Sequence, residues 1–262
     1  MADIVLDNLD YAVGGRPVLR GVSLAVEKGE IFGILGRSGA GKTTLLRLIL
    51  GLIRPTAGRV LLFGEDITQM SERELNRMRK RVGMVFQHNA LFDSLTVFEN
   101  VAFYPRRFMH LSEDELRALV AEKLALVGMA GTEQLMPAQL SGGMAKRVGI
   151  ARALASEPEV ILYDEPSAGL DPIMTGTVSS VIKSLRDSAR VTSVVVSHDV
   201  ANVFGLCDRV AFLHEGTIRC LGTPAELERS ADSLLQQFLT GSPEGPMADT
   251  AAVAVGEKGV GQ

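Results

Sequence analysis

The 262-residue sequence contains no tryptophan, only two cysteines, and few aromatic residues, 5% of the chain. Cys207 and Cys220 have no metal-ligand spacing and no neighbouring histidine pair, so we expect reduced, buried thiols and no zinc site. No uninterrupted apolar run approaches the ~18 residues that a membrane span needs. We therefore expect a globular protein that does not itself cross a bilayer.

Positive charge is also scarce. The sequence has 27 Lys and Arg against 31 Asp and Glu, and it lacks a basic stripe interleaved with aromatic residues. This pattern predicts no nucleic-acid partner. Residues 1–10 show no charged-then-apolar leader with a cleavage site, so we expect no secretory signal and a cytoplasmic location.

Apolar patterning predicts an α/β fold. Residues 3–13 and 21–30 alternate apolar and polar side chains, which is typical of antiparallel strands. Residues 30–36 form a nearly continuous apolar run, as in a parallel strand buried on both faces, and a glycine-rich loop and a helix follow. Further strands are predicted over residues 81–87, 159–166, 191–199 and 209–216.

The domain organisation follows from where the patterning changes. Residues 88–157 are mostly helical, with Ser112 and Glu115 forming a capping box, so they predict a helical subdomain inserted into a domain spanning residues 1–240. Residues 241–262 lose aromatic residues and periodicity and predict a flexible C-terminal tail.

The stretch GRSGAGKT matches the pattern G-x-x-x-x-G-K-[ST], between a buried strand and a helix, as a phosphate-binding loop requires. Its glycines let the backbone form a nest of N–H donors, Lys42 brings a cation to the terminal phosphates, and Thr43 offers a hydroxyl to Mg²⁺. The predicted nucleotide contacts are Gly36, Arg37, Ser38, Gly39, Ala40, Gly41, Lys42, Thr43 and Thr44.

Polar side chains also stand at the ends of three other predicted strands, where parallel sheets bind ligands. Asp164 suits a Mg²⁺ partner, and Glu165 is placed to polarise an attacking water. Gln87 is expected to reach Mg²⁺ or the water, and His198 the terminal phosphate. Standing alone, the acidic pair would simply cap the next helix, and an isolated Gln or His is more often structural. Their shared position beside a phosphate loop favours the catalytic interpretation.

A second stretch, LSGGMAKR at residues 140–147, places a serine and two glycines ahead of a helix. Such a helix start exposes N–H groups where the dipole favours an anion. Ser141, Gly142, Gly143 and Met144 therefore form another phosphate seat, although nothing in the sequence suggests a second nucleotide.

The order of the motifs resembles the ATP-binding cassette (ABC) family of transporter ATPases: phosphate loop, Gln87, LSGGM, YDEP, AGLDP and SHD. The resemblance covers about residues 1–240 and implies a P-loop ATPase fold with an antiparallel β subdomain, and ATP with Mg²⁺. It also implies that Tyr11 stacks on adenine, Glu165 is the catalytic carboxylate and Asp171 links two ATP sites. Family members form head-to-tail dimers in which LSGG of one subunit covers the partner's ATP, so a homodimer is expected.

Met144 replaces the glutamine usual after LSGG. The stretches FQHNALFDSLTVFENVAF, LMPAQLSGGMAKR and DEPSAGLDPI resemble the ATPases of Mce-linked phospholipid transporters, the type that maintains lipid asymmetry. This resemblance implies an integral membrane permease, an Mce-domain lipid-binding protein and a small STAS-domain subunit as partners. It places the chain peripherally on the cytoplasmic face of the inner membrane.

The segment after Gln87 is where family members grip a cytoplasmic helix of the permease. Ala90, Leu91, Phe92 and Phe98 suit such a helix-in-groove contact, and they suit the core of the helical subdomain equally well.

Other function classes stay as alternatives. The first is the ATPase of another ABC importer or exporter. A soluble ABC protein acting on ribosomes or DNA would normally carry two cassettes or long coiled arms, and a nucleotide-sensing module would be expected to lack Glu165.

Overall fold

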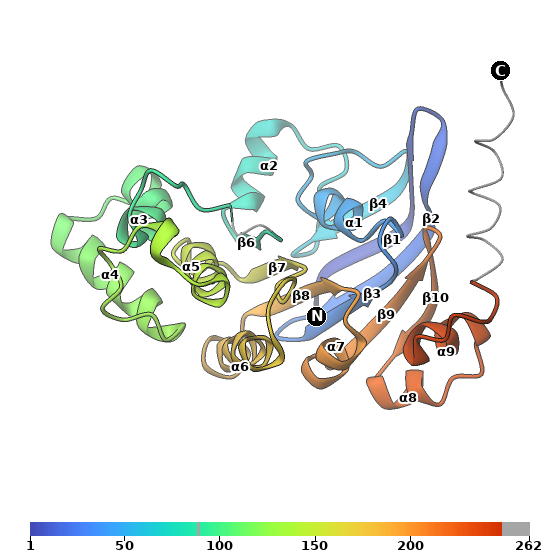
Figure 1. Ribbon diagram of the computed structural model, residues 1–262. Coiled ribbons are helices and arrows are strands. Elements are labelled where there is room, and N and C mark those ends of the chain that lie inside the picture. The colour runs from blue at the N-terminus through green and yellow to red at the C-terminus, as the bar shows by residue number, and fades with distance from the viewer. Residues whose placement is uncertain (88–89, 248–262) are drawn as a thin grey trace, which may run out of the picture.

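The computed structural model describes residues 1–87 and 90–247, except for the side chain of Ala189. Its N-terminal part forms an antiparallel sheet in the order β2-β1-β4-β5 (Figure 1). The strands are β1 (Ala2–Val13), β2 (Arg16–Glu27), β4 (Ala57–Leu62) and β5 (Glu65–Asp66). This sheet confirms the predicted antiparallel β subdomain.

A second sheet of six strands has the order β10-β9-β3-β8-β7-β6 and is parallel except for β10. Every residue of β3, β7 and β8 is buried, in agreement with their continuous apolar runs. The strands are β3 (Ile31–Leu35), β6 (Val82–Val85), β7 (Val160–Asp164), β8 (Thr192–Ser197), β9 (Arg209–His214) and β10 (Thr217–Gly222).

Alternate residues of the central strands face two different cores. Phe32 and Ile34 pack with α1 (Lys42–Ile49) and the antiparallel sheet, whereas Ile31 and Leu35 face the opposite core. That second core includes α6 (Pro172–Ala189) and α7 (Val200–Leu206). The six-stranded sheet is therefore covered on both faces, and the carboxyl ends of its parallel strands meet at one edge.

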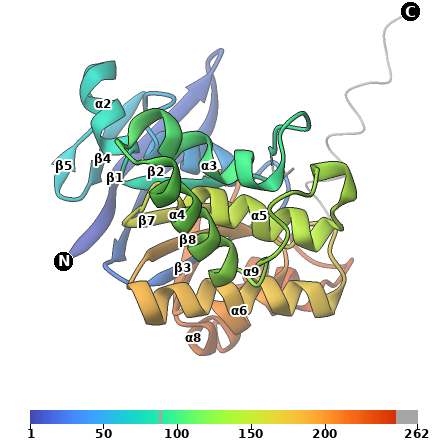
Figure 2. The same ribbon diagram turned by 90° about the vertical axis from the view of Figure 1, so that its left-hand side faces the viewer.

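The helical region lies beyond the β6–β7 side of this sheet in Figure 1. Thr96 with Glu99 and Ser112 with Glu115 form capping boxes that start two of its helices. Its core is continuous with the sheet core on the α6 side. Figure 2 shows α5 running alongside α6. The helices are α2 (Glu72–Arg79), which belongs to the sheet part, α3 (Val97–Phe108), α4 (Glu113–Leu126), the short 3₁₀ helix η1 (Pro137–Gln139) and α5 (Gly142–Leu154).

The C-terminal segment contacts the last helix among the described residues. After α8 (Pro224–Glu228) and α9 (Ser233–Thr240), the chain folds back onto α9. The Met247 N–H donates to Gln237 Oε1 at 2.7 Å, the Gln237 amide donates to the Ser242 carbonyl at 3.1 Å, and Met247 is buried. The flexible tail predicted over residues 241–262 stays a prediction, and residues 248–262 lie outside those described.

The predicted α/β fold class is confirmed, with strands β4, β5 and β10 added to those expected. The domain limits 1–240 and 88–157 stay predictions. Within residues 1–87 and 90–247, no helix combines the length and the apolar character required to span a membrane.

Candidate nucleotide-binding and catalytic site

A cavity of about 300 Å³ lies where β3, β6, β7 and β8 end. Its lining comes from residues 38–39 and 41–44 of the phosphate loop and from Val18, Gln87, Glu165 and His198. The structure therefore brings together most of the residues predicted from four separate motifs.

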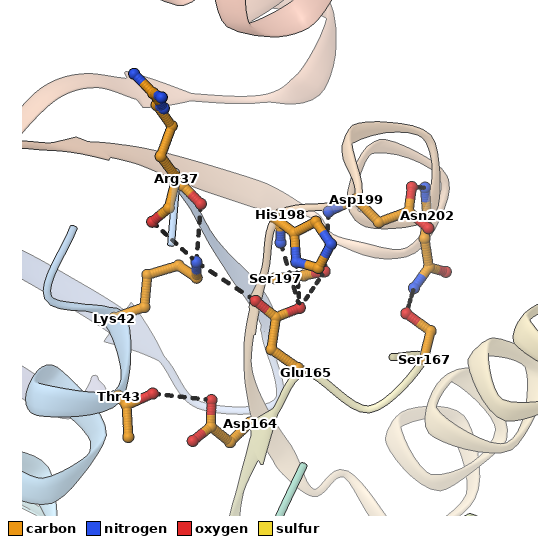
Figure 3. Close-up of polar contacts among 11 residues, drawn as sticks. Arg37, Lys42, Thr43, Asp164, Glu165, Ser167, Ser197, His198, Asp199 and Asn202 are labelled. Atoms are coloured by element: carbon orange, nitrogen blue, oxygen red, sulfur yellow. Dashed lines mark hydrogen bonds and ion pairs between the residues drawn. The ribbon is translucent and has the colours of Figure 1, made fainter. Parts of the chain in front are cut away.

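The phosphate loop requires glycine at two positions. A Cβ at Gly36 would lie 2.3 Å from the carbonyl oxygen of Leu213, and Gly41 has a φ of 107°. The loop places Lys42 at the start of α1, where its buried ammonium donates to the Gly36 carbonyl at 2.8 Å and the Arg37 carbonyl at 3.3 Å (Figure 3). The N-cap residue of this helix is Gly41, which has no side chain to cap it, so the leading N–H groups can bind an anion.

Glu165 follows β7 and is held from two sides (Figure 3). Its Oε1 lies 3.4 Å from Lys42 Nζ. Its Oε2 accepts a hydrogen bond from Ser197 Oγ at 3.1 Å and lies 3.0 Å from His198 Nδ1. The carboxylate is buried, and the backbone has a φ of 49°, a left-handed conformation that a non-glycine residue adopts at a cost of about 1–3 kcal/mol.

Two predicted metal ligands touch directly. Thr43 Oγ1 donates to Asp164 Oδ1 at 3.2 Å, and burial raises the pKa of the Asp164 carboxyl while this hydrogen bond lowers it. Gln87 lines the same cavity with an exposed side chain. Hydroxyl, carboxylate and amide oxygens are hard ligands, and this donor set fits Mg²⁺.

Gln87 is also tied to the helix that follows LSGG. Its backbone carbonyl accepts a hydrogen bond from the Nζ of Lys146, a residue of α5 that is only 3% exposed. Burial lowers the pKa of Lys146, and the nearby charges of Asp164 and Glu165 raise it. Lys146 thus connects α5 to a residue that lines the cavity.

The remaining predicted residues lie outside the cavity. Ser141 and Gly142 are exposed at the start of α5, where Ser141 Oγ accepts a hydrogen bond from Met144 N at 3.3 Å. Asp171 Oδ1 caps α6 by accepting from two backbone N–H groups. Tyr11 lies on β1 opposite Leu19, partly buried against the core. Their nucleotide contacts stay predictions.

Sequence reasoning missed Ser197, Lys146 and Asn202. Ser197 stands directly before His198 at the end of the same strand, and this position was the signal that could have identified it. Lys146 and Asn202 form hydrogen bonds to segments that are distant in the sequence, and no local sequence pattern predicts such bonds.

A second cavity, of about 520 Å³, lies between the end of β6 and α3. Exposed Phe86, Phe92 and Phe103 line it together with Ala90, and the Phe92 and Phe103 ring centroids are 4.7 Å apart. We call this cavity the phenylalanine groove. Of the residues expected to grip a partner helix, Ala90 and Phe92 line the groove, whereas Leu91 and Phe98 pack against the core.

Comparisons with known proteins agree with this site. The family described as "ABC transporter" matches residues 19–168. The intermembrane phospholipid transport system ATP-binding protein MlaF of Haemophilus influenzae is 44% identical over 244 residues, which cover 93% of this chain and 92% of the relative. The methionine import ATP-binding protein MetN of Caulobacter vibrioides is 46% identical over 208 residues, which cover 79% of this chain and 62% of the relative.

Among solved structures, a dimer of the ATP-binding cassette MJ0796 with ADP and Pi gives a TM-score of 0.76 at 33% identity. The match covers 84% of this chain and 98% of the cassette. The family match spans more than half of the sequence, and the first relative is similar along nearly its whole length. The chain therefore belongs to the ABC transporter family and is an ATP-binding ATPase of that family.

Proposed function

We propose that this chain powers phospholipid movement across the bacterial envelope as the ATPase subunit of a membrane transporter. The observation that carries this proposal is the 44% identity to a phospholipid-transport ATPase along more than nine-tenths of both chains. The methionine-import relative is matched over 62% of its length, whereas the phospholipid-transport relative is matched over 92%.

The site supports hydrolysis of ATP by residues in distinct roles. Lys42 pairs with the terminal phosphates, and the N–H groups of the phosphate loop bind their oxygens. Glu165 orients and polarises the attacking water, while His198 donates to the terminal phosphate. Thr43, Asp164 and Gln87 would hold Mg²⁺, which when bound supplies positive charge against the phosphates.

A second copy of the chain completes the site. Ser141 and Gly142 are exposed and lie outside the cavity, so the LSGG stretch is suited to a phosphate held by another subunit. A two-fold dimer uses both segments twice. The dimeric cassette structure that this chain resembles supports the arrangement.

The phenylalanine groove is the proposed contact for a cytoplasmic helix of the permease. Its exposed aromatic rings offer an apolar surface that an amphipathic helix can cover. This contact would hold the chain on the cytoplasmic face of the inner membrane. An Mce-domain lipid-binding protein and a small STAS-domain subunit complete the proposed assembly.

Affinity purification of the tagged chain with its membrane partners, followed by lipid mass spectrometry and an ATPase assay, tests the proposal. We expect a permease and an Mce-domain protein to co-purify, with phospholipid bound and with turnover abolished by Glu165→Gln. Recovery with an amino-acid permease, or with no membrane protein, would contradict the phospholipid assignment.

A further inference from the structure

Asn202 joins three segments beside the candidate catalytic carboxylate. It lies in the first turn of α7, where its backbone N–H donates to Asp199 Oδ1 at 3.1 Å. Its side-chain Nδ2 donates to Ser167 Oγ at 3.1 Å (Figure 3), and its Oδ1 accepts from Ser179 Oγ of α6 at 2.6 Å. One amide group thus connects α7, α6 and the turn that follows β7.

That turn sets the backbone of Glu165. The Ala168 N–H donates to the Glu165 carbonyl and the Leu170 N–H to the Ser167 carbonyl, each at 3.1 Å. The left-handed φ of Glu165 persists only if surrounding groups fix it. Ser167 is buried within the turn, and its hydroxyl is where Asn202 attaches.

The side chain of Glu165 is held by the neighbouring loop. Ser197 Oγ donates to its Oε2 and accepts from the Asp199 N–H at 3.0 Å, and Asp199 in turn caps the helix that carries Asn202. The segment from Ser197, at the end of β8, to Asn202, in α7, therefore contacts both the carboxylate of Glu165 and the turn that carries its backbone.

We infer that Asn202 is a positioning residue for ATP hydrolysis: by clamping Ser167 to Ser179, it fixes the turn of Glu165 relative to His198 and to α6. The inference rests on the proposed role of Glu165. Asn202 and Ser179 also line an open cavity of about 530 Å³ between α6 and α7. Water can replace the lost hydrogen bonds there, so breaking the clamp should change geometry more than stability.

The test compares alanine variants of the full chain in its transporter complex. Asn202→Ala and Ser167→Ala remove the bond to the turn, and Ser179→Ala removes only the bond to α6. Ser180→Ala is the matched control, because the Ser180 hydroxyl on the same helix donates to the Gly176 carbonyl of its own helix at 2.9 Å. The measurements are kcat per bound ATP, KM for ATP, and melting temperature, with Glu165→Gln as the reference for a lost catalytic group.

We expect Asn202→Ala and Ser167→Ala each to lower kcat about tenfold with KM changed less than about twofold, since the phosphate loop is intact. The double variant should be no slower than Asn202→Ala alone, because the hydrogen bond that Ser167→Ala removes is already lost in Asn202→Ala. Ser179→Ala should show a smaller fall, and Ser180→Ala none.

A kcat per bound ATP within twofold of the parent for both Asn202→Ala and Ser167→Ala overturns the inference, as does an additive loss in the double variant. If Asn202→Ala does not fold, Ser167→Ala and Ser179→Ala still decide the question. If Glu165→Gln hydrolyses ATP at the parental rate, the proposed catalytic role fails instead, and the two failures are thereby separated.

Discussion

The phosphate loop and the LSGG stretch are both glycine-rich segments before a helix, yet their surroundings within the chain differ. Lys42 of the phosphate loop is buried and lies 3.4 Å from Glu165, beside Asp164 and His198 from two other strand ends. At the LSGG stretch, Ser141 is exposed and its hydroxyl contacts its own helix.

The difference supports the proposal that the phosphate loop holds the nucleotide and that the LSGG stretch completes the site of another subunit. A helix start and a hydroxyl supply only a partial positive charge and a few donors. A triphosphate also requires cations and a means of polarising water, and these side chains gather at the phosphate loop. The LSGG stretch fits the role of a donor to the partner's phosphate in the proposed dimer.

The largest effect is expected for Lys42→Ala. Turnover should fall by at least ~10³-fold and ATP binding should weaken, because the variant removes the cation proposed to pair with the terminal phosphates. Lys123→Ala is the control, because Lys123 is similarly buried, at 8% against 7% exposed, but pairs with Glu122 on α4. Steady-state hydrolysis by the purified complex measures both. Equal turnover in the two variants would remove the phosphate-loop assignment.

Glu165→Gln should abolish hydrolysis while ATP still binds. The amide keeps the size of the side chain but cannot polarise water as a carboxylate does. We expect the closed dimer to accumulate, which size-exclusion chromatography with ATP and Mg²⁺ detects. A variant that hydrolyses ATP at the parental rate would move the catalytic role to another residue.

A mixed dimer tests the comparison directly. One subunit carries Lys42→Ala and the other Ser141→Arg, whose bulk should keep the LSGG backbone away from the phosphate. If LSGG acts on the partner's ATP, both lesions fall in one composite site and the other site is intact. We therefore expect about one trapped ATP per mixed dimer.

The two homodimeric variants serve as inactive controls for this experiment. Nucleotide trapping is measured along with turnover, because one sound site can close without sustaining the full cycle. Trapping no greater than in the controls would show that each subunit uses both segments on its own nucleotide.

A smaller effect is expected where the two segments are linked inside one chain. Lys146, one turn into α5, donates to the backbone carbonyl of Gln87 at the edge of the first cavity. Lys146→Met should lower kcat about fivefold with little change in KM, since Gln87 loses its fixed position but the phosphate loop is untouched. Lys123→Met controls for loss of a buried ammonium. Equal kcat values in the two variants would contradict a link between α5 and Gln87.

The sequence predicted the main sheet and the meeting of its strand ends because β3, β7 and β8 are continuous apolar runs followed by chemically distinctive residues. It missed β4 and β10 because both bury only alternate or scattered residues, and β10 is also an edge strand. β5 is two residues long and has no pattern to read.

Within the site, too, some features could be predicted from the sequence and others could not. The motifs and their positions after predicted strands were enough to predict that one edge of the sheet gathers Lys42, Thr43, Asp164, Glu165 and His198. They could not reveal the left-handed backbone of Glu165 or the contacts made by Asn202 and Lys146. These features depend on which turns and helices become neighbours after folding, and residue type alone does not determine that.

The smallest effect on turnover is expected at the C-terminus, whose described residues 241–247 fold back onto α9. A chain ending at Met247 keeps the hydrogen bonds to Gln237 and should melt like the parent. A chain ending at Thr240 loses the buried Met247, about 2 kcal/mol of apolar burial, and should melt about 4–8 °C lower. In both, hydrolysis per bound ATP should match the parent, because the cavity at the strand ends is unchanged. Calorimetry and single-turnover hydrolysis on the same preparations measure the two quantities. A loss of turnover per bound ATP in either truncated chain would show that the C-terminus acts on the phosphate loop or on the LSGG stretch.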